Sequence, residues 1–206
     1  IRAYMQRTGA PTHVGHMVSV KDRQNGLLNP NAHLHISGIN LEMVEQSPML
    51  WDPVRYLDTC PSSDGAVAMV LVDEATAEGM RSPAWIHGLA TRSEPILFSG
   101  RDQVNPQAGQ DCARAVYTQA GISDPRREID VAELYVPFSW FEPMWLENVG
   151  FAEPGHGWRM TEDGATALTG DMPINPSGGV MCTNPIGASG MLRFAEAARQ
   201  VRGDAE

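Results

Sequence analysis

The stretch from residue 175 to residue 190 constrains the fold of this chain more than any other stretch. It reads Asn-Pro-Ser-Gly-Gly-Val-Met-Cys-Thr-Asn-Pro-Ile-Gly-Ala-Ser-Gly, with Gly170 close before it. Helix and strand interiors avoid this composition, because glycine costs backbone entropy and proline removes an N–H donor. Residues 191–202 then carry apolar side chains at helical spacing. We therefore predict a glycine loop (residues 175–190) whose backbone passes close to a ligand before it enters a helix.

Composition narrows the class of protein. The chain has 206 residues and is 42% hydrophobic, which suits one substantial core. A net charge of −10 argues against a nucleic-acid partner. Three cysteines without a Cys-x-x-Cys pair disfavour a disulfide scaffold or a zinc ribbon, so a cytoplasmic location is expected. No apolar run approaches the roughly 18–20 residues that a membrane span needs. The first and last residues, Ile1 and Glu206, lead us to expect part of a longer polypeptide.

Periodicity and stop signals predict the regular elements. Helical patterns span residues 1–8, 14–22, 75–79, 109–121, 138–149 and 191–202. Apolar runs that predict strands span residues 66–72, 84–91 and 129–136, the first of them buried on both faces. Alternation of strands with helices of this length predicts an α/β layered domain.

The glycine loop resembles a loop of the thiolase superfamily that reads Asn-x-x-Gly-Gly, four variable residues, then His-Pro-x-Gly-Ala-Ser/Thr-Gly. Every framework residue of that pattern is present except the histidine, whose position Asn184 takes. Residues 47–66 resemble the segment that opens the second half of the sterol-carrier-protein type thiolases. Residues 131–138, Val-Ala-Glu-Leu-Tyr-Val-Pro-Phe, stand where that family ends a strand with Glu, an apolar residue and Asn or His.

The resemblance implies a thiolase-like fold, built from two similar halves stacked in layers of helix and sheet. This chain is similar to the second half. On that basis residues 1–60 are the tail of the connecting loop region, and residues 61–206 are the C-terminal thiolase-like domain. The N-terminal half and the final hairpin, where thiolases keep their catalytic cysteines, lie outside this chain.

Tyr135 is the first candidate catalytic residue, because it ends a predicted strand where ligands approach open α/β sheets. The resemblance implies that the residue here helps to hold the oxygen or water that stabilises a thioester enolate. A phenol can donate a hydrogen bond to an oxyanion or carry a proton. With an ordinary pKa of about 10, a phenol acts as a base at neutral pH only when neighbours lower that pKa. The alternative is a plain strand-end residue.

Asn184 is the second candidate catalytic residue. An amide does not titrate, so it cannot activate a cysteine as the thiolase histidine does, but it can donate a hydrogen bond to a thioester oxygen. The alternative is a turn residue before Pro185. Cys182 could be read as a nucleophile, although a small buried cysteine is commoner. Cys60 and Cys112 are expected in the core.

Substrate-binding candidates share one property: their backbone N–H groups, or the helix that follows, can face a thioester or a phosphate. They are Gly178, Gly179, Gly187, Ala188 and Ser189. A merely tight turn is the alternative, and it does not explain so many glycines at once. His156, in a loop bracketed by glycines, is a further substrate-binding candidate, with a surface role as the alternative.

Histidines at metal-like spacing occur near the N-terminus, namely His13, His16, His33 and His35. They lie in a stretch that reads as irregular, with no carboxylate at fitting spacing. We therefore expect solvated loop histidines and no metal site.

The strand-end tyrosine and the missing histidine resemble the lipid-transfer-protein branch linked to bacterial sterol side-chain breakdown. That branch includes aldolases for acyl-CoA thioesters with a β-hydroxyl group. The resemblance implies retro-aldol cleavage through a stabilised thioester enolate, with Tyr135 in proton transfer and Asn184 orienting the thioester oxygen. It also implies a homodimer, a small OB-fold partner and no cofactor beyond the coenzyme A of the substrate. The alternatives are a 3-oxoacyl-CoA thiolase with an altered base, and a non-catalytic thiolase-like subunit that binds acyl-CoA or scaffolds a partner.

Overall fold

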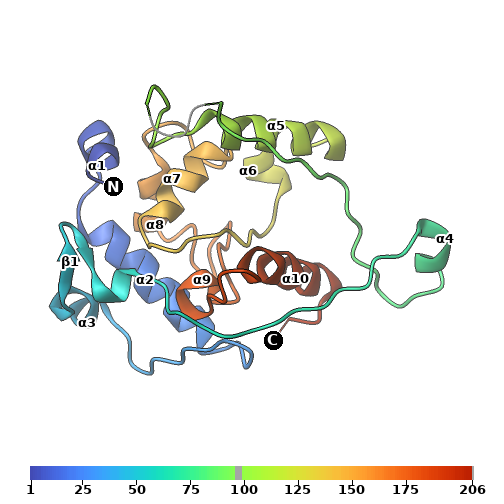
Figure 1. Cartoon of the computed structure of the whole chain (residues 1–206), viewed down its shortest axis with the longest axis horizontal. Coiled ribbons are helices and arrows are strands. Elements are labelled where there is room, and N and C mark those ends of the chain that lie inside the picture. The colour runs from blue at the N-terminus through green and yellow to red at the C-terminus, as the bar shows by residue number, and fades with distance from the viewer. Residues whose placement is uncertain (96–98, 206) are drawn as a thin grey trace.

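The computed structural model describes residues 1–95 and 99–205, and its regular structure is mostly helical (Figure 1). The helices are α1 (Arg2–Thr8), α2 (His13–Gly26), α3 (Leu41–Gln46), α4 (Glu74–Ala77), α5 (Gln107–Ala120), α6 (Pro125–Glu128), α7 (Phe141–Asn148), α8 (Gly157–Glu162), α9 (Gly179–Cys182) and α10 (Ser189–Arg202). The other elements are the strands β1 (Met49–Trp51) and β2 (Val54–Arg55) and the 3₁₀ turn η1 (Tyr56–Asp58). Within the described ranges, no helix is long and apolar enough to cross a membrane.

The helices predicted from periodicity are confirmed as α1, α2, α4, α5, α7 and α10. Glycine stops end two of them. Gly121 after α5 and Gly203 after α10 adopt φ values of 72° and 71°, a left-handed conformation that glycine reaches without steric cost. Their N–H groups bond back to carbonyl oxygens of the last helical turn. Helix ends that depend on such local contacts can therefore be predicted from the sequence.

The hairpin and four short helices, α3, α6, α8 and α9, were not predicted. Helix α3 begins after Asn40, whose Oδ1 accepts a hydrogen bond from the N–H of Met43 at 2.9 Å. This is an ordinary N-cap, so Asn40 followed by Glu42 in the first turn was the signal for it. Strands β1 and β2 pair in antiparallel fashion directly after α3.

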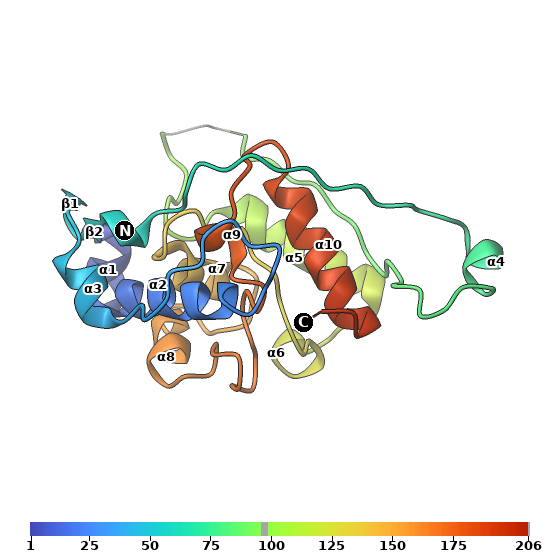
Figure 2. The same ribbon diagram turned by 90° about the horizontal axis from the view of Figure 1, so that it is seen from below.

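The strand predictions for residues 66–72 and 84–91 are wrong. Both stretches are extended, the first leading to α4 and the second leading away from it, and α4 stands apart from the other helices in both views (Figures 1 and 2). Neither pairs with another strand among the residues described. Instead, Gln119 of α5 bonds the N–H and the carbonyl of Leu89 at 3.0 and 3.1 Å. Val70 is 87% exposed. An apolar pattern indicates that the side chains of a segment are suited to burial. A strand also needs the backbone of a second segment to pair with, and the pattern does not reveal it.

The prediction of a regular strand over residues 129–136 is also wrong, although the stretch is extended. An isolated parallel bridge forms at Ala132, whose N–H bonds Pro173 O (3.1 Å) and whose carbonyl accepts from the N–H of Asn175 (2.8 Å). Two residues further along, the backbone N–H of Leu134 donates to the side-chain Oδ1 of Asn175 at 2.7 Å. A side chain here replaces the backbone ladder that a strand would continue.

Helix α2 is the centre of the N-terminal part of the fold. It packs against α3, α8, α9 and η1. Gly15 allows a close approach, because a Cβ there would lie 2.2 Å from Nε1 of Trp140. The buried hydrophobic cluster around this contact consists of Tyr4, Ala10, Val14, Val54, Val104, Trp140 and Met144. Residues from 1–60 and from 61–206 thus share one core, and the boundary between these two portions stays a prediction.

A buried charge cluster joins α2 to α7 and to the chain before the glycine loop. Nζ of Lys21 lies 2.6 Å from Oδ1 of Asp22, 2.9 Å from Oε2 of Glu142 and 2.8 Å from the carbonyl oxygen of Ile174. The side chains of both carboxylates are fully buried. One cation therefore faces two carboxyl groups, and burial raises the pKa of Glu142 to about 7 against the attraction of Lys21.

Glu142→Gln is expected to flatten the pH dependence of the free energy of unfolding. The folded-state pKa of Glu142 lies above its ordinary value of 4.5, so the protonated carboxyl stabilises the fold. This contribution, about 1 to 3 kcal/mol, is lost as the pH rises from 4.5 through 7. Urea unfolding of both proteins at a series of pH values measures the difference. Glu45→Gln, on the exposed side of α3, is the matched control. Parallel profiles for the wild type and Glu142→Gln would contradict the prediction.

Candidate functional site

Asn175 holds the start of the glycine loop against two other parts of the chain. It is fully buried and adopts a φ of 54°, which is uncommon for a residue other than glycine. Its Oδ1 accepts from the N–H of Leu134 (2.7 Å) and its Nδ2 donates to Oδ2 of Asp22 (3.4 Å). Its carbonyl accepts from Nδ2 of Asn25 at 3.1 Å. One side chain thus fixes the loop relative to α2 and to the stretch that leads to Tyr135.

A buried ion pair makes a second tie between that stretch and the glycine loop. Nη1 of Arg193, in α10, lies 2.7 Å from Oε2 of Glu133, and the two side chains are 7% and 1% exposed. Ser177 joins them: its N–H and its hydroxyl donate to the Glu133 carboxylate at 3.0 and 2.9 Å, and its Oγ accepts from Arg193 at 2.6 Å. The first turn of α10 is therefore held in a fixed position beside the Tyr135 stretch.

Asn184 is 3% exposed and lies at the centre of a small polar cluster. Its Nδ2 donates to Sγ of Cys60 (3.0 Å) and its Oδ1 accepts from Oγ of Ser189 (2.7 Å). Its N–H donates to Oγ of Ser63 (3.0 Å), and its carbonyl accepts from the N–H of Ser63 (3.3 Å). The structure therefore brings together two predicted site residues, Asn184 and Ser189, and adds Cys60 and Ser63 to them. One hydrogen of the Asn184 amide is not used in these contacts.

The expectation that Cys60 is a core residue is wrong, because its thiol is half-buried beside Asn184. The N–H of Cys60 donates to the carbonyl of Pro137 at 2.9 Å, so the thiol lies between the glycine loop and the end of the Tyr135 stretch. Burial raises the pKa of the Cys60 thiol, although the hydrogen bond from Asn184 acts in the opposite direction. The thiol is therefore protonated at neutral pH. Cys112 is also only partly buried.

Tyr135 is 42% exposed. Its carbonyl accepts from Nε1 of Trp145 at 3.0 Å, and its neighbours Leu134 and Pro137 are bonded to Asn175 and Cys60. The backbone around Tyr135 is thus fixed while its phenol remains accessible. Among the described residues, no hydrogen bond joins that phenol to Asn184. The catalytic role of Tyr135 stays a prediction.

Gly178 and Gly179 lie where the glycine loop touches α2. Their φ values are 87° and 56°. A Cβ at Gly178 would lie 2.5 Å from Cα of Gly26, and a Cβ at Gly179 would lie 2.9 Å from Cγ of Asn175. Backbone conformation and close packing therefore require glycine at both positions, without any ligand. Their substrate-binding role stays a prediction.

The turn before α10 is the accessible part of the glycine loop. The N–H of Ala188 closes this turn onto the carbonyl of Pro185 at 2.7 Å. Gly187 is exposed, and a Cβ on it would meet no atom within 4 Å. Ser189, which begins α10, is buried and bonded to Asn184. Gly187 is therefore accessible from solvent at the start of α10. The substrate-binding role of Gly187, Ala188 and Ser189 stays a prediction.

His156 is not brought to Asn184. It is exposed, precedes α8 at the N-cap position without a side-chain cap hydrogen bond, and lines a depression with Arg126, Arg159 and Asp171. In Figure 2 the loop before α10 is at the top and α8 is at the bottom. Any part that His156 plays in binding a substrate stays a prediction.

Two of the four N-terminal histidines are not solvated loop residues. His13 and His16 lie on α2, where His16 is 4% exposed with its Nδ1 3.0 Å from Oδ1 of Asp58. Nε2 of His13 lies 2.9 Å from Oε1 of Glu162. Because α2 begins at His13, both histidines are helical, and His16 lies on the face of α2 that packs inward. In residues 1–95 and 99–205, no group of three His, Cys, Asp or Glu side chains is placed to hold a metal ion.

The prediction of Cys182 as a small buried residue is confirmed. It is fully buried, its Sγ donates to the carbonyl of Asp22 at 3.4 Å, and burial raises its pKa to about 12. A Cβ on Gly26 would lie 2.4 Å from its Sγ. A thiol in this environment packs α9 against α2 and is a poor nucleophile.

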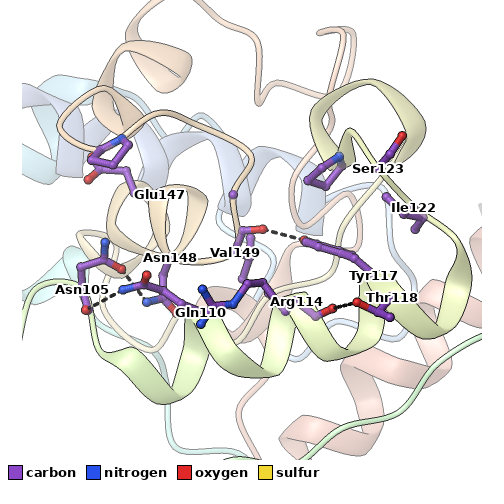
Figure 3. Close-up of a pocket in the computed structure, with 14 residues that line it drawn as sticks. Asn105, Gln110, Arg114, Tyr117, Thr118, Ile122, Ser123, Glu147, Asn148 and Val149 are labelled. Carbon is purple, nitrogen blue, oxygen red and sulfur yellow. Dashed lines mark hydrogen bonds between the residues drawn. The ribbon is translucent and has the colours of Figure 1, made fainter.

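A separate pocket of about 450 Å³ lies between α5 and α7 (Figure 3). Its polar side chains are bonded within the protein. The hydroxyl of Tyr117 donates to the carbonyl of Val149 at 2.6 Å, and Nδ2 of Asn148 donates to Oδ1 of Asn105 at 2.6 Å. None of the predicted site residues lines this pocket. It is therefore distinct from the Asn184 cluster.

The sequence model described as "Thiolase C-terminal domain-like" matches residues 90–206. The chain belongs to this family. The matched range contains Tyr135 and the whole glycine loop, so both stretches that meet at Asn175 lie within the thiolase-like domain. The predicted resemblance to the C-terminal half of the thiolase superfamily is confirmed.

Curated relatives of this thiolase-like chain match almost all of it. The acetyl-CoA acetyltransferase of Methanothermobacter thermautotrophicus is 36% identical over 207 residues, which are 99% of this chain and 53% of that protein. The 17-hydroxy-3-oxo-4-pregnene-20-carboxyl-CoA lyase of Mycobacterium tuberculosis is 32% identical over 209 residues, 98% of this chain and 53% of that protein. The chain spans about half the length of these relatives.

A solved structure described as "Ltp2-ChsH2(DUF35) aldolase" shares the fold. The TM-score is 0.91 at 30% sequence identity, and the match covers 99% of this chain and 54% of that chain. The predicted α/β thiolase-like fold is therefore confirmed, even though residues 66–72 and 84–91 do not pair as strands.

Asn175→Ala is expected to lower the free energy of unfolding by about 2 to 4 kcal/mol. The substitution leaves the partly buried N–H of Leu134 without its acceptor, and alanine keeps the unfavourable positive φ. Urea unfolding measures the loss. Ser82→Ala is the matched control, because Ser82 has a φ of 50° but is exposed. Equal stability of Asn175→Ala and the wild type would show that the Asn175 side chain does not hold these segments.

Proposed function

We propose that the protein cleaves a carbon–carbon bond of an acyl-CoA thioester, by retro-aldol cleavage of a β-hydroxyacyl-CoA from a steroid or lipid side chain. The observation that carries this proposal is the amide of Asn184 at the position of the thiolase histidine. An amide cannot take the proton of a nucleophilic thiol, which thiolytic cleavage requires. Retro-aldol cleavage requires instead that a thioester enolate be stabilised, and one fold can serve both reactions because they share that enolate.

In the proposed reaction the β-hydroxyl group loses its proton and the Cα–Cβ bond breaks. The electron pair of that bond forms the thioester enolate, a carbonyl group forms at Cβ, and Cα then receives a proton. Tyr135 takes part in the proton transfers, and Asn184 orients the thioester oxygen. The open first turn of α10, at Gly187 and Ala188, accepts the thioester or a phosphate of coenzyme A. The reaction is balanced without a metal or a redox cofactor.

The relatives support carbon–carbon bond chemistry on acyl-CoA and do not choose between two reactions. The lyase of M. tuberculosis and the aldolase structure favour retro-aldol cleavage. The acetyltransferase, at 36% identity, favours the second candidate, a 3-oxoacyl-CoA thiolase. The name of the aldolase structure includes a second component, which supports our proposal of a partner protein. The small OB fold of that partner and a homodimer of this chain stay predictions. A non-catalytic acyl-CoA-binding or scaffold subunit is the third candidate, and a cytoplasmic location stays a prediction.

Tyr135→Phe is expected to reduce kcat for cleavage of a β-hydroxyacyl-CoA by about 100-fold or more, because the phenol is the proton carrier. The assay uses the intact protein with its partner and follows the carbonyl product and the shortened acyl-CoA by chromatography. Tyr56→Phe, at a tyrosine that is 58% exposed outside the site, is the control.

Three results would contradict parts of this proposal. Unchanged cleavage by Tyr135→Phe would remove the assignment of Tyr135. A wild type that thiolyses a 3-oxoacyl-CoA with free coenzyme A, but leaves β-hydroxyacyl-CoA intact, is a thiolase. A wild type that binds acyl-CoA and performs neither reaction is a binding subunit.

A further inference from the structure

We propose that His33 and Ser63 form the proton-accepting pair of the Asn184 site. Nδ1 of His33 lies 2.8 Å from Oγ of Ser63, and the same Oγ accepts the N–H of Asn184 at 3.0 Å. The N–H of His33 donates to Oγ1 of Thr183 at 2.9 Å. The imidazole is therefore attached to the glycine loop by its backbone and joined to Asn184 through one hydroxyl group. This inference rests on the proposed retro-aldol function.

The proposed reaction needs an acceptor that the other site groups do not supply. Tyr135 is assigned to give the proton that Cα receives, so a different group must accept the proton of the β-hydroxyl group. The amide of Asn184 does not titrate. Burial raises the pKa of the Cys60 thiol, which therefore also keeps its proton. The neutral imidazole of His33 has one basic nitrogen that can accept a proton.

The hydrogen-bond directions suit proton transfer from Ser63 to His33. Because Oγ of Ser63 accepts from the N–H of Asn184, its own hydrogen is available to Nδ1 of His33. In that arrangement the neutral imidazole carries its proton on Nε2. The separation of 2.8 Å is within the range over which a base takes a proton. Ser63 is half-buried and His33 is exposed, so the imidazole can exchange protons with solvent while the hydroxyl faces the site.

The proton-transfer steps balance. The β-hydroxyl group of the substrate gives its proton to Oγ of Ser63 while the Ser63 proton passes to Nδ1 of His33. The Cα–Cβ bond then breaks to give a carbonyl group and the thioester enolate. Tyr135 donates a proton to Cα of the enolate. The imidazolium of His33 and the phenolate of Tyr135 are restored to their neutral forms by proton transfer through solvent.

Other titratable groups lie on the segments bonded to His33. They include Cys60 and Asp64 on the stretch that carries Ser63, Cys182 on the glycine loop, and His35 on the stretch of His33 itself. Arg23 of α2 donates to the carbonyl of Thr59 at 3.0 Å and acts on Cys60. The ring of His35 bonds the carbonyl of Asn29 through Nε2 at 2.9 Å, away from Asn184. His35 therefore provides a matched control two residues from the proposed base.

His33→Asn separates proton transfer from positioning. Asparagine offers an oxygen near the place of Nδ1, so it can still accept from Ser63, but it does not titrate. We expect kcat for cleavage of a β-hydroxyacyl-CoA to fall about 100-fold or more, with KM little changed. We also expect the decline of wild-type kcat toward acid pH to disappear. His35→Asn should keep the wild-type rate and pH profile. The assay uses the intact protein with its partner, and circular dichroism checks that each variant is folded.

Each outcome decides the proposal. A wild-type rate and pH profile in His33→Asn would overturn the assignment of His33 while the proposed function stands. A wild-type rate in His33→Asn together with a reduced rate in His33→Ala would make His33 a positioning residue only. Failure of the wild type to cleave any β-hydroxyacyl-CoA would overturn the proposed function, and this inference with it. If Ser63→Ala keeps the wild-type rate, Ser63 does not transmit the proton.

Discussion

The arrangement of the glycine loop, α2 and the Tyr135 stretch depends on the hydrogen bonds of the buried Asn175 side chain. It joins the amide of Leu134 to Asp22 of α2, and Lys21 bonds the carbonyl of the preceding Ile174. These polar groups lie where water cannot replace a lost partner, so breaking one contact leaves a donor or a charge unpaired in the interior. The Asn175 side-chain network, together with the isolated backbone bridge at Ala132, therefore sets the distance between the glycine loop and the stretch that carries Tyr135.

That network holds a site in which the central group does not titrate and the titratable groups surround it. Asn184 is bonded to Cys60, Ser63 and Ser189, and His33 reaches it through Ser63. Where a thiolase has a basic nitrogen on the glycine loop, this chain has an amide, and the imidazole joined to it through Ser63 belongs to a neighbouring stretch. Such a shift favours chemistry that moves the proton of a substrate hydroxyl group over chemistry that activates a protein thiol.

Helices α5 and α10 could be predicted because their apolar spacing and their glycine stops are local signals. The thiolase-like fold could be predicted because the glycine loop is a dense motif. The strands could not, since pairing depends on a second backbone that an apolar pattern does not reveal. Cys60 and His33 could not be assigned to the site either. Cys60 meets Asn184 across 124 positions of sequence, and the only hint was that residues 47–66 already matched the thiolase pattern.

Native-state hydrogen exchange at the amide of Leu134 tests most directly whether Asn175 holds the two site segments together. That amide donates to a side chain in the interior, so its protection reports on this contact alone. We predict that it exchanges only through global unfolding, with an opening free energy equal to the value from urea unfolding of the same protein. Exchange through a local opening, at a free energy several kcal/mol below the global value, would contradict the central role of Asn175.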